Sequence, residues 1–124
     1  MAYYEHLPIY KKALDMAVYF EKIVKNFSRY HKYTIGTGLR NISVEIVLKI
    51  AKINSLKDKN KALLGLREEI IKLKALIHIA KEVRAFHNFN SFETSVRCVN
   101  EIAMQMEGWL RGQKGPESAR QESG

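Results

Sequence analysis

Four basic residues recur at helical spacing in the second half of the sequence, where their chemistry is that of phosphate binding. They are Arg67, Lys74, His78 and Lys81. Offsets of seven, four and three place them on one side of an α-helix. Lys74, His78 and Lys81 are then about 5–6 Å apart in succession at the Cβ atoms, and Arg67 lies two turns before Lys74. Cations at this spacing can follow a nucleic-acid backbone without reading its bases. The alternative is an ordinary solvated face, because three glutamates lie in the same segment.

A second basic group lies near the end of the first helical segment and in the polar stretch that follows it. Its members are Lys22, Lys25, Arg29 and Lys32, and Arg40 follows a few residues later. Two tyrosines, Tyr30 and Tyr33, alternate with these cations. One interpretation is that the cations complement the negative end of a helix dipole. The other is a patch that binds phosphate, and we include these five residues in the predicted nucleic-acid interface.

The sequence contains no spacing that is typical of a catalytic or metal site. None of the four histidines pairs with another histidine, a cysteine or a carboxylate at ligand spacing. The segment GTGLR precedes a helix but lacks the lysine of a phosphate-binding loop. The single cysteine, Cys98, lies in a helical pattern and is expected to be a half-buried thiol. We therefore predict a protein that is not an enzyme and holds neither a metal nor a cofactor.

The net charge of +8, from 21 Lys and Arg against 13 Asp and Glu, is the strongest bulk signal. A surface of this sign attracts polyanions at a distance, although a basic protein without such a partner would show the same balance. The first residues do not form a signal peptide, and no window is apolar enough for a membrane span. With one cysteine there is no internal disulfide, so a cytoplasmic location is expected.

Four segments carry apolar residues at alternating offsets of three and four, which predicts four amphipathic helices. The longest is predicted from Asp58, its N-cap, to Phe86. The first helix is predicted to begin near Pro8. The second is predicted to follow the glycines after Thr34 and to run to about Asn54, and the fourth to extend from an Asn90 cap to Gly112. The predicted inner stripe of the longest helix consists of Leu63, Leu66, Ile70, Leu73, Ile77 and Ala80.

Four helices joined by short connections predict an all-α, up-down-up-down four-helix bundle. The bundle is expected to form one domain over residues 1–112, and residues 113–124 are expected to be a disordered tail. Several helices have apolar residues beyond one inner stripe, and monomers seldom expose such faces. We therefore expect a homo-oligomer, although a wide core would also explain the pattern. The predicted interface residues are Ile9, Met16, Ile23, Ile79, Val83 and Phe86.

Three segments resemble a known family. They are YTIGTGLRNISVEIVLKIAKIN, LREEIIKLKALIHIAKEV and a closing helix that ends in GWLR. From about Leu7 to Arg111 the sequence resembles the accessory variability determinant (Avd) proteins of diversity-generating retroelements. The wider group consists of four-helix-bundle proteins related to ribosomal-RNA intervening-sequence proteins. It shares the start of the second helix, here Gly36, Leu39 and Arg40.

The resemblance implies a non-catalytic protein that forms a ring-shaped homopentamer with a basic surface. Such proteins bind the reverse transcriptase of the element and associate with RNA and DNA, and the complex makes mutagenised cDNA that diversifies a target gene. The functional basic positions of the third helix fall on Lys74 and His78, which would more usually be arginine-like. Two alternatives stay open at this point: an RNA-binding bundle of the intervening-sequence type, and an oligomeric scaffold.

Overall fold

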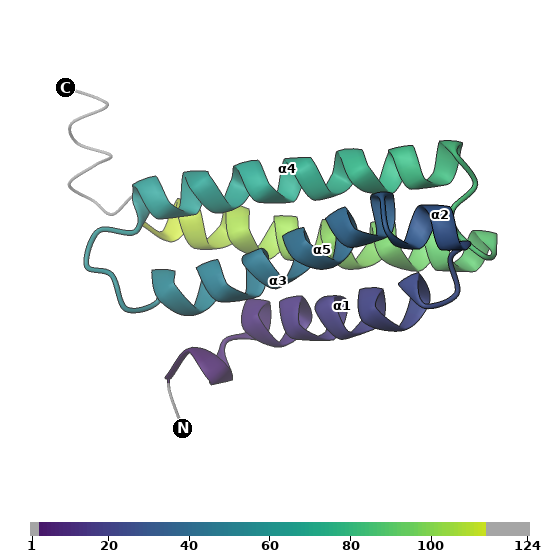
Figure 1. Ribbon diagram of the computed structural model, residues 1–124. Helices are drawn as coiled ribbons and strands as arrows, with labels where there is room; N and C mark the ends of the chain where they lie inside the picture. Colours follow the sequence, from purple (N-terminus) through teal and green to yellow (C-terminus); the bar gives the residue numbers. More distant parts are fainter. Residues whose placement is uncertain (1–2, 114–124) are drawn as a thin grey trace.

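The computed structural model describes residues 3–113, which form helices and their connections (Figure 1). A short 3-10 helix, η1, precedes four long α-helices and one short one. Their bounds are η1 Tyr3–His6, α1 Pro8–Val24, α2 Arg29–Lys32, α3 Ile35–Ile53, α4 Asn60–Glu82 and α5 Phe89–Gly112. The expected tail, apart from Gln113, lies outside the described residues. None of the described helices is long and apolar enough to cross a lipid bilayer.

The four long helices pack as a closed four-sided bundle. Helix α1 contacts α3 and α5, and α4 contacts the same two helices from the opposite corner. Successive long helices run in opposite directions, so α2 and the α4–α5 connection lie at one end and the α3–α4 connection lies at the other (Figure 1). The predicted up-down-up-down four-helix bundle is thereby confirmed.

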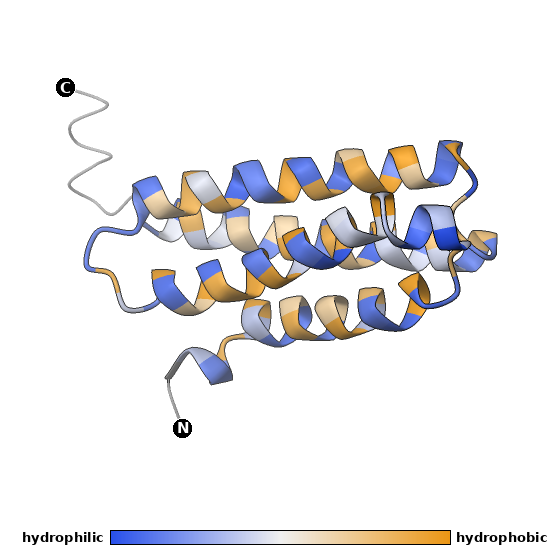
Figure 2. Ribbon diagram, in the orientation of Figure 1, coloured by the Kyte–Doolittle hydropathy of each residue, from blue (hydrophilic) through white to orange (hydrophobic). Residues whose placement is uncertain are grey.

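The core follows the predicted stripe of α4. All six of its residues are almost fully buried, because offsets of three and four keep them on one side of the helix facing α3 and α5. Hydrophobic and hydrophilic residues alternate in bands along every long helix (Figure 2). The inner stripe predicted for the helix after Thr34 is also buried for the most part, at Leu39, Ile46, Ile50 and Ile53.

The buried face of α1 includes two residues that were predicted to lie at an interface between copies. Ile9 and Met16 are 5% and 0% exposed and lie in the bundle core, so their assignment to an interface between copies was wrong. Ile23 and Phe86 are half-buried and pack against the core. Ile79 and Val83 are the two predicted interface residues that stay exposed.

The buried face of α5 is rotated from the apolar stripe that the sequence predicts for this helix, which consists of Phe92, Val96, Val99, Ala103, Met106 and Leu110. Ser91 and Ser95 face the core together with Val99, Ile102 and Met106, whereas Phe92 and Val96 are only half-buried. The Ser95 hydroxyl donates to the backbone carbonyl of Ser91 at 2.8 Å. Because this bond satisfies the hydroxyl within its own helix, a serine can be buried where the pattern favoured an apolar residue.

Two helix ends differ from the prediction. Helix α4 ends at Glu82, because Arg84 takes a positive φ of 60° that breaks the helix before Phe86. At its start Lys59 occupies the N-cap, although the Asp58 carboxylate accepts from the Asn60 N–H at 3.2 Å. Helix α5 is capped by Asn88, whose side-chain oxygen Oδ1 accepts from the Ser91 N–H at 2.8 Å; the predicted cap, Asn90, lies inside the helix.

The polar stretch between the first two long helices is helical, where a turn was expected. Its cap is Ser28, whose hydroxyl oxygen accepts from the His31 N–H at 3.5 Å. The chain reverses tightly because Gly36 lies against α1 and α2. A Cβ atom at Gly36 would meet Val24 Cγ1 at 2.7 Å and the His31 carbonyl oxygen at 2.9 Å. This close approach positions the basic residues of α2 at the end of the bundle.

Candidate nucleic-acid interface

The four basic residues predicted on one side of α4 lie along the groove between α4 and α5, and we call them the basic ridge: Arg67, Lys74, His78 and Lys81. Two hollows follow this groove, with volumes of about 530 and 240 Å3, and Lys74 lines both of them. Apolar side chains such as Ile70, Met104 and Met106 line the larger hollow. The ridge therefore faces a partly apolar groove and does not stand on an open charged face.

Arg67 is held by an ion pair across this groove. Its Nε and Nη2 atoms donate to the two carboxylate oxygens of Glu107 on α5, both at 2.7 Å. These hydrogen bonds lower the pKa of Glu107 and raise the pKa of Arg67. A guanidinium that already makes two hydrogen bonds to a carboxylate is a poorer first contact for a phosphate group than an unpaired cation.

The other three ridge residues are placed differently. Lys74 is half-buried and His78 is exposed, and both line the smaller hollow. Lys81 lies nearer the end of α4, with its Nζ atom 5.1 Å from the centroid of the Phe92 ring on α5. A cation over an aromatic ring is attracted to the π electrons. The structure thus brings Lys74 and His78 together in the groove and docks Lys81 on an aromatic side chain.

The second basic group lies at the end of the bundle that carries α2. Lys22 and Lys25 come from the end of α1, and Arg29 and Lys32 bracket the short helix. Within residues 3–113, none of these four cations takes part in an ion pair. They are available to an external anion.

Two exposed aromatic rings accompany these cations. Tyr30 is 74% exposed and Tyr33 is 69% exposed, although apolar rings usually lose most of their surface to packing. Because bases stack on exposed aromatic rings while nearby cations hold the phosphates, such a pairing suits single-stranded nucleic acid. We name Lys22, Lys25, Arg29, Tyr30, Lys32 and Tyr33 the α2 patch.

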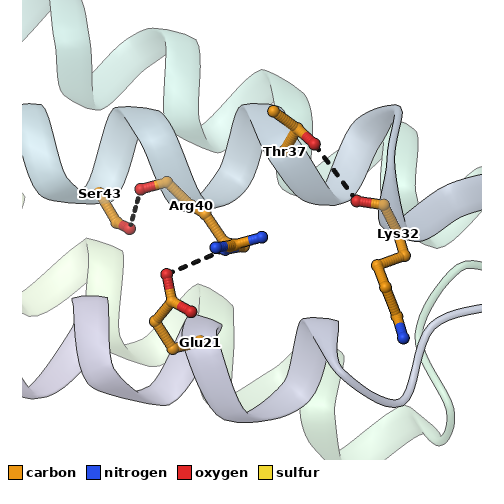
Figure 3. Close-up of polar contacts among 5 residues, drawn as sticks. All are labelled: Glu21, Lys32, Thr37, Arg40 and Ser43. Atoms are coloured by element: carbon orange, nitrogen blue, oxygen red, sulfur yellow. Dashed lines mark hydrogen bonds and ion pairs between the residues drawn. The ribbon is translucent and has the colours of Figure 1, made fainter.

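Arg40 has a structural partner close to this patch. Its Nε donates to the Glu21 carboxylate at 2.9 Å and so joins α3 to α1 (Figure 3). The same view shows Thr37 donating to the Lys32 carbonyl oxygen at 3.3 Å, which ties α2 to the first turn of α3. Arg40 therefore contributes to helix packing beside the patch, with its guanidinium already paired.

A family model described as bAvd-like matches residues 7–113. The chain belongs to this family. The match spans all four long helices, from just before α1 to just after α5, and so agrees with the resemblance seen over about Leu7 to Arg111. Membership identifies an Avd-type accessory protein. A search among curated proteins finds no match to the chain.

In this bAvd-like protein the chemically reactive side chains of residues 3–113 form no cluster that could hold a metal ion, because no three His, Cys, Asp or Glu side chains among them lie close enough together. Cys98 is half-buried, and burial raises the pKa of its thiol. A raised pKa keeps the thiol protonated near neutral pH and makes it a weak nucleophile.

The predicted interface left out one basic segment of the bAvd-like chain. Residues 49–61 contain five lysines and one aspartate and form the end of α3, the following connection and the first turn of α4. The signal was local charge density, which a search for helical spacing passes over because the segment crosses a helix boundary. The lysines are Lys49, Lys52, Lys57, Lys59 and Lys61.

Proposed function

We propose that this bAvd-like protein is a non-catalytic accessory protein of a diversity-generating retroelement. It binds the reverse transcriptase of the element and the template RNA, or DNA, through basic surfaces, and so supports mutagenic cDNA synthesis and retrohoming. Membership of the family over residues 7–113 supports this role. The net charge of +8 supports a polyanionic partner.

The observation that carries the nucleic-acid part is the α2 patch. Its four cations lie outside the ion pairs of the described residues, and Tyr30 and Tyr33 expose about three quarters and two thirds of their surfaces. An unpaired strand presents both phosphates and open base faces, whereas a duplex hides the bases. The patch therefore favours single-stranded RNA or DNA over duplex.

The groove between α4 and α5 supplies a second contact in this proposal. Lys74 and His78 face the groove, whereas Arg67 is paired with Glu107 and Lys81 is docked on Phe92. We assign a backbone phosphate to Lys74, with His78 beside it, and keep Arg67 and Lys81 as residues that shape the groove.

The protein acts as a homo-oligomer in this proposal, a ring of five copies in the cytoplasm, as the family resemblance implies. Exposed apolar side chains on outward faces support an assembly, because water would otherwise cover them. They include Leu14 and Val18 on α1, Val44 and Leu48 on α3, and Ile71 and Ile79 on α4. Mass measurement by light scattering tests the subunit number: a monomer at micromolar concentration would contradict the assembly.

Binding to a fluorescent single-stranded RNA tests the α2 patch. Tyr30→Ala together with Tyr33→Ala should weaken binding by about tenfold or more, because each base–aromatic stack contributes about 1–3 kcal/mol. The double Tyr→Phe variant keeps both rings and is the matched control, so its affinity should stay close to that of the parent protein. Equal affinity of the Ala and Phe variants would rule out stacking at this patch.

Co-purification with the reverse transcriptase of a diversity-generating retroelement tests the accessory role. A stable complex that needs this protein for cDNA synthesis is the expected result. A chain that binds RNA but has no reverse transcriptase partner would instead fit the intervening-sequence type of bundle. A chain that assembles but binds neither partner would be a scaffold.

A further inference from the structure

A hollow of about 580 Å3 lies where α3 ends and α4 begins, at the end of the bundle opposite α2 (Figure 1). Three lysines line it, Lys49 and Lys52 from α3 and Lys61 from α4. The hollow is separate from the groove between α4 and α5, and its three lysines belong to the lysine-rich segment 49–61. Its size falls in the range of small-molecule sites.

The charges around this hollow favour an anion. Three lysines oppose one aspartate, Asp58, and that carboxylate already accepts the Asn60 N–H. Within the described residues, none of the three lysines is in an ion pair. Ammonium groups that surround one hollow without carboxylate partners repel one another, so a bound anion relieves their repulsion.

The rest of the lining is apolar. Ile53, Leu56 and Ala62 contribute side chains, and Gly65 contributes bare backbone. Glycine inside a helix is destabilising relative to alanine, so Gly65 in the second turn of α4 needs an explanation. Packing does not supply one, because a Cβ atom at Gly65 would meet nothing within 4 Å. The missing side chain instead leaves room for a ligand to approach the α4 backbone.

The connection beside the hollow is held by its own hydrogen bonds. The Lys59 Nζ donates to the Leu56 carbonyl oxygen, and the Ser55 hydroxyl donates to the Lys52 carbonyl oxygen at 2.7 Å. A lining fixed before binding loses little conformational entropy when a ligand arrives. The hollow is therefore preformed.

We propose that this hollow binds a phosphorylated nucleotide, with the base against the apolar surface at Gly65 and the phosphates on Lys49, Lys52 and Lys61. An amphipathic anion matches a lining that is cationic on one part and apolar on the other. The nucleotide is either free or the phosphorylated end of a nucleic-acid strand, since both present the same chemistry. The inference does not depend on the proposed role of the α2 patch.

Competition against a fluorescent ATP analogue tests the site in the full-length protein. ATP should compete, adenosine should compete about tenfold less well because it lacks phosphates, and inorganic tripolyphosphate should also compete about tenfold less well because it lacks a base. Tripolyphosphate that competes as well as ATP would reduce the site to general charge attraction and overturn the proposal.

Gly65→Leu locates the binding. The leucine side chain enters open space in the hollow, so the variant should fold and lose affinity for the ATP analogue by about tenfold or more. Gly108→Leu is the matched control on α5, where a Cβ atom meets only the end of the flexible Arg111 side chain at 3.7 Å; its affinity should be unchanged. Equal affinity of Gly65→Leu and the parent protein would overturn the proposal.

Two oligonucleotides that differ only in a 5′-phosphate or a 5′-hydroxyl separate the sources. If strand ends occupy the hollow, the phosphorylated strand competes better than the hydroxyl strand, and Gly65→Leu removes that difference. If free nucleotide is the ligand, both strands compete equally and more weakly than ATP. Tyr30→Ala with Tyr33→Ala should leave ATP binding unchanged, so failure at the α2 patch and failure at the hollow give different results.

Discussion

Arg67 on α4 donates two hydrogen bonds of 2.7 Å to the Glu107 carboxylate on α5, although the two residues are 40 positions apart in the sequence. Similar ion pairs join α1 to α5, at Lys12 and Glu101, and α3 to α1, at Arg40 and Glu21. Each pair crosses a helix–helix boundary at the bundle surface. Such exposed pairs contribute little energy, but together they favour one register of the helices.

The Arg67–Glu107 pair predicts a pH dependence of stability. Hydrogen bonds from Arg67 lower the pKa of Glu107 below its ordinary value of 4.5, so the folded state binds this proton less readily than the unfolded state. The stabilisation is therefore present above pH 4.5 and is lost as the pH falls through the lowered pKa. Glu107→Gln should have a slightly lower Tm than the parent protein at pH 7, and the gap should close in acid.

Glu68→Gln is the control for this measurement, because Glu68 is exposed on the same helix and forms no ion pair among the described residues. Its Tm difference from the parent protein should be smaller at pH 7. A gap for Glu107→Gln that persists unchanged in acid would contradict the assignment of the effect to this carboxylate.

Two glycines in helices should respond to alanine in opposite directions. At Gly36 a Cβ atom would meet Val24 Cγ1 at 2.7 Å and the His31 carbonyl oxygen at 2.9 Å, and the backbone atom cannot rotate away. Gly36→Ala should lower the free energy of unfolding by about 1–3 kcal/mol through overpacking. Gly65→Ala meets no atom within 4 Å and should raise it by about 0.5–1 kcal/mol through helix propensity. Urea denaturation measures both, and the same sign for the two variants would refute the packing argument.

The sequence predicted the architecture because the apolar spacing of α4 is unambiguous. Leu63 to Ala80 recur at offsets of three and four, and all six are buried as predicted. On α1 the apolar residues cover a broader arc, so spacing alone did not separate an inner face from an outer one, and Met16 was placed on the wrong side. On α5 the inner face was predicted wrongly because it contains serines, which the apolar pattern does not count. Ser95 can be buried because its hydroxyl donates a hydrogen bond to the preceding turn.

The candidate site was harder to predict than the fold. The spacing placed Arg67 and Lys74 on the same side of α4, and both residues line the same hollow. The spacing did not indicate that Arg67 would form an ion pair with Glu107. Pairing across helices depends on how two helices are rotated against each other, and neither sequence segment contains that angle. The lysines around the α3–α4 hollow were missed because their segment crosses a helix boundary, and Lys49 and Lys52 line the same hollow as Lys61 only when the chain folds back at the connection.

The N-cap of α5 gives a direct test of a corrected prediction. The side-chain oxygen of Asn88, Oδ1, accepts from both the Ser91 N–H, at 2.8 Å, and the Ser91 hydroxyl, at 3.0 Å. Asn88→Ala should lower the free energy of unfolding by about 1 kcal/mol, as loss of a cap usually does. Asn90→Ala is the matched control, because Asn90 is exposed inside the helix and alanine is the better helix former there. A larger loss for Asn90→Ala would restore the cap that the sequence suggested.

Lys74 should contribute to nucleic-acid binding in proportion to one phosphate contact. It lines both hollows of the groove and is in no ion pair within residues 3–113, so Lys74→Glu removes an available cation and adds a repelling carboxylate. Binding to single-stranded RNA should weaken several-fold, and the slope of log affinity against log salt should become shallower by about 0.7, the value for one phosphate on a single strand. Lys72→Glu makes the same charge change on α4 at a residue that pairs with Glu69 at 3.3 Å, and it should leave the slope almost unchanged. Equal effects of the two variants would mean that net charge alone drives binding and that the groove has no direct contact with the backbone.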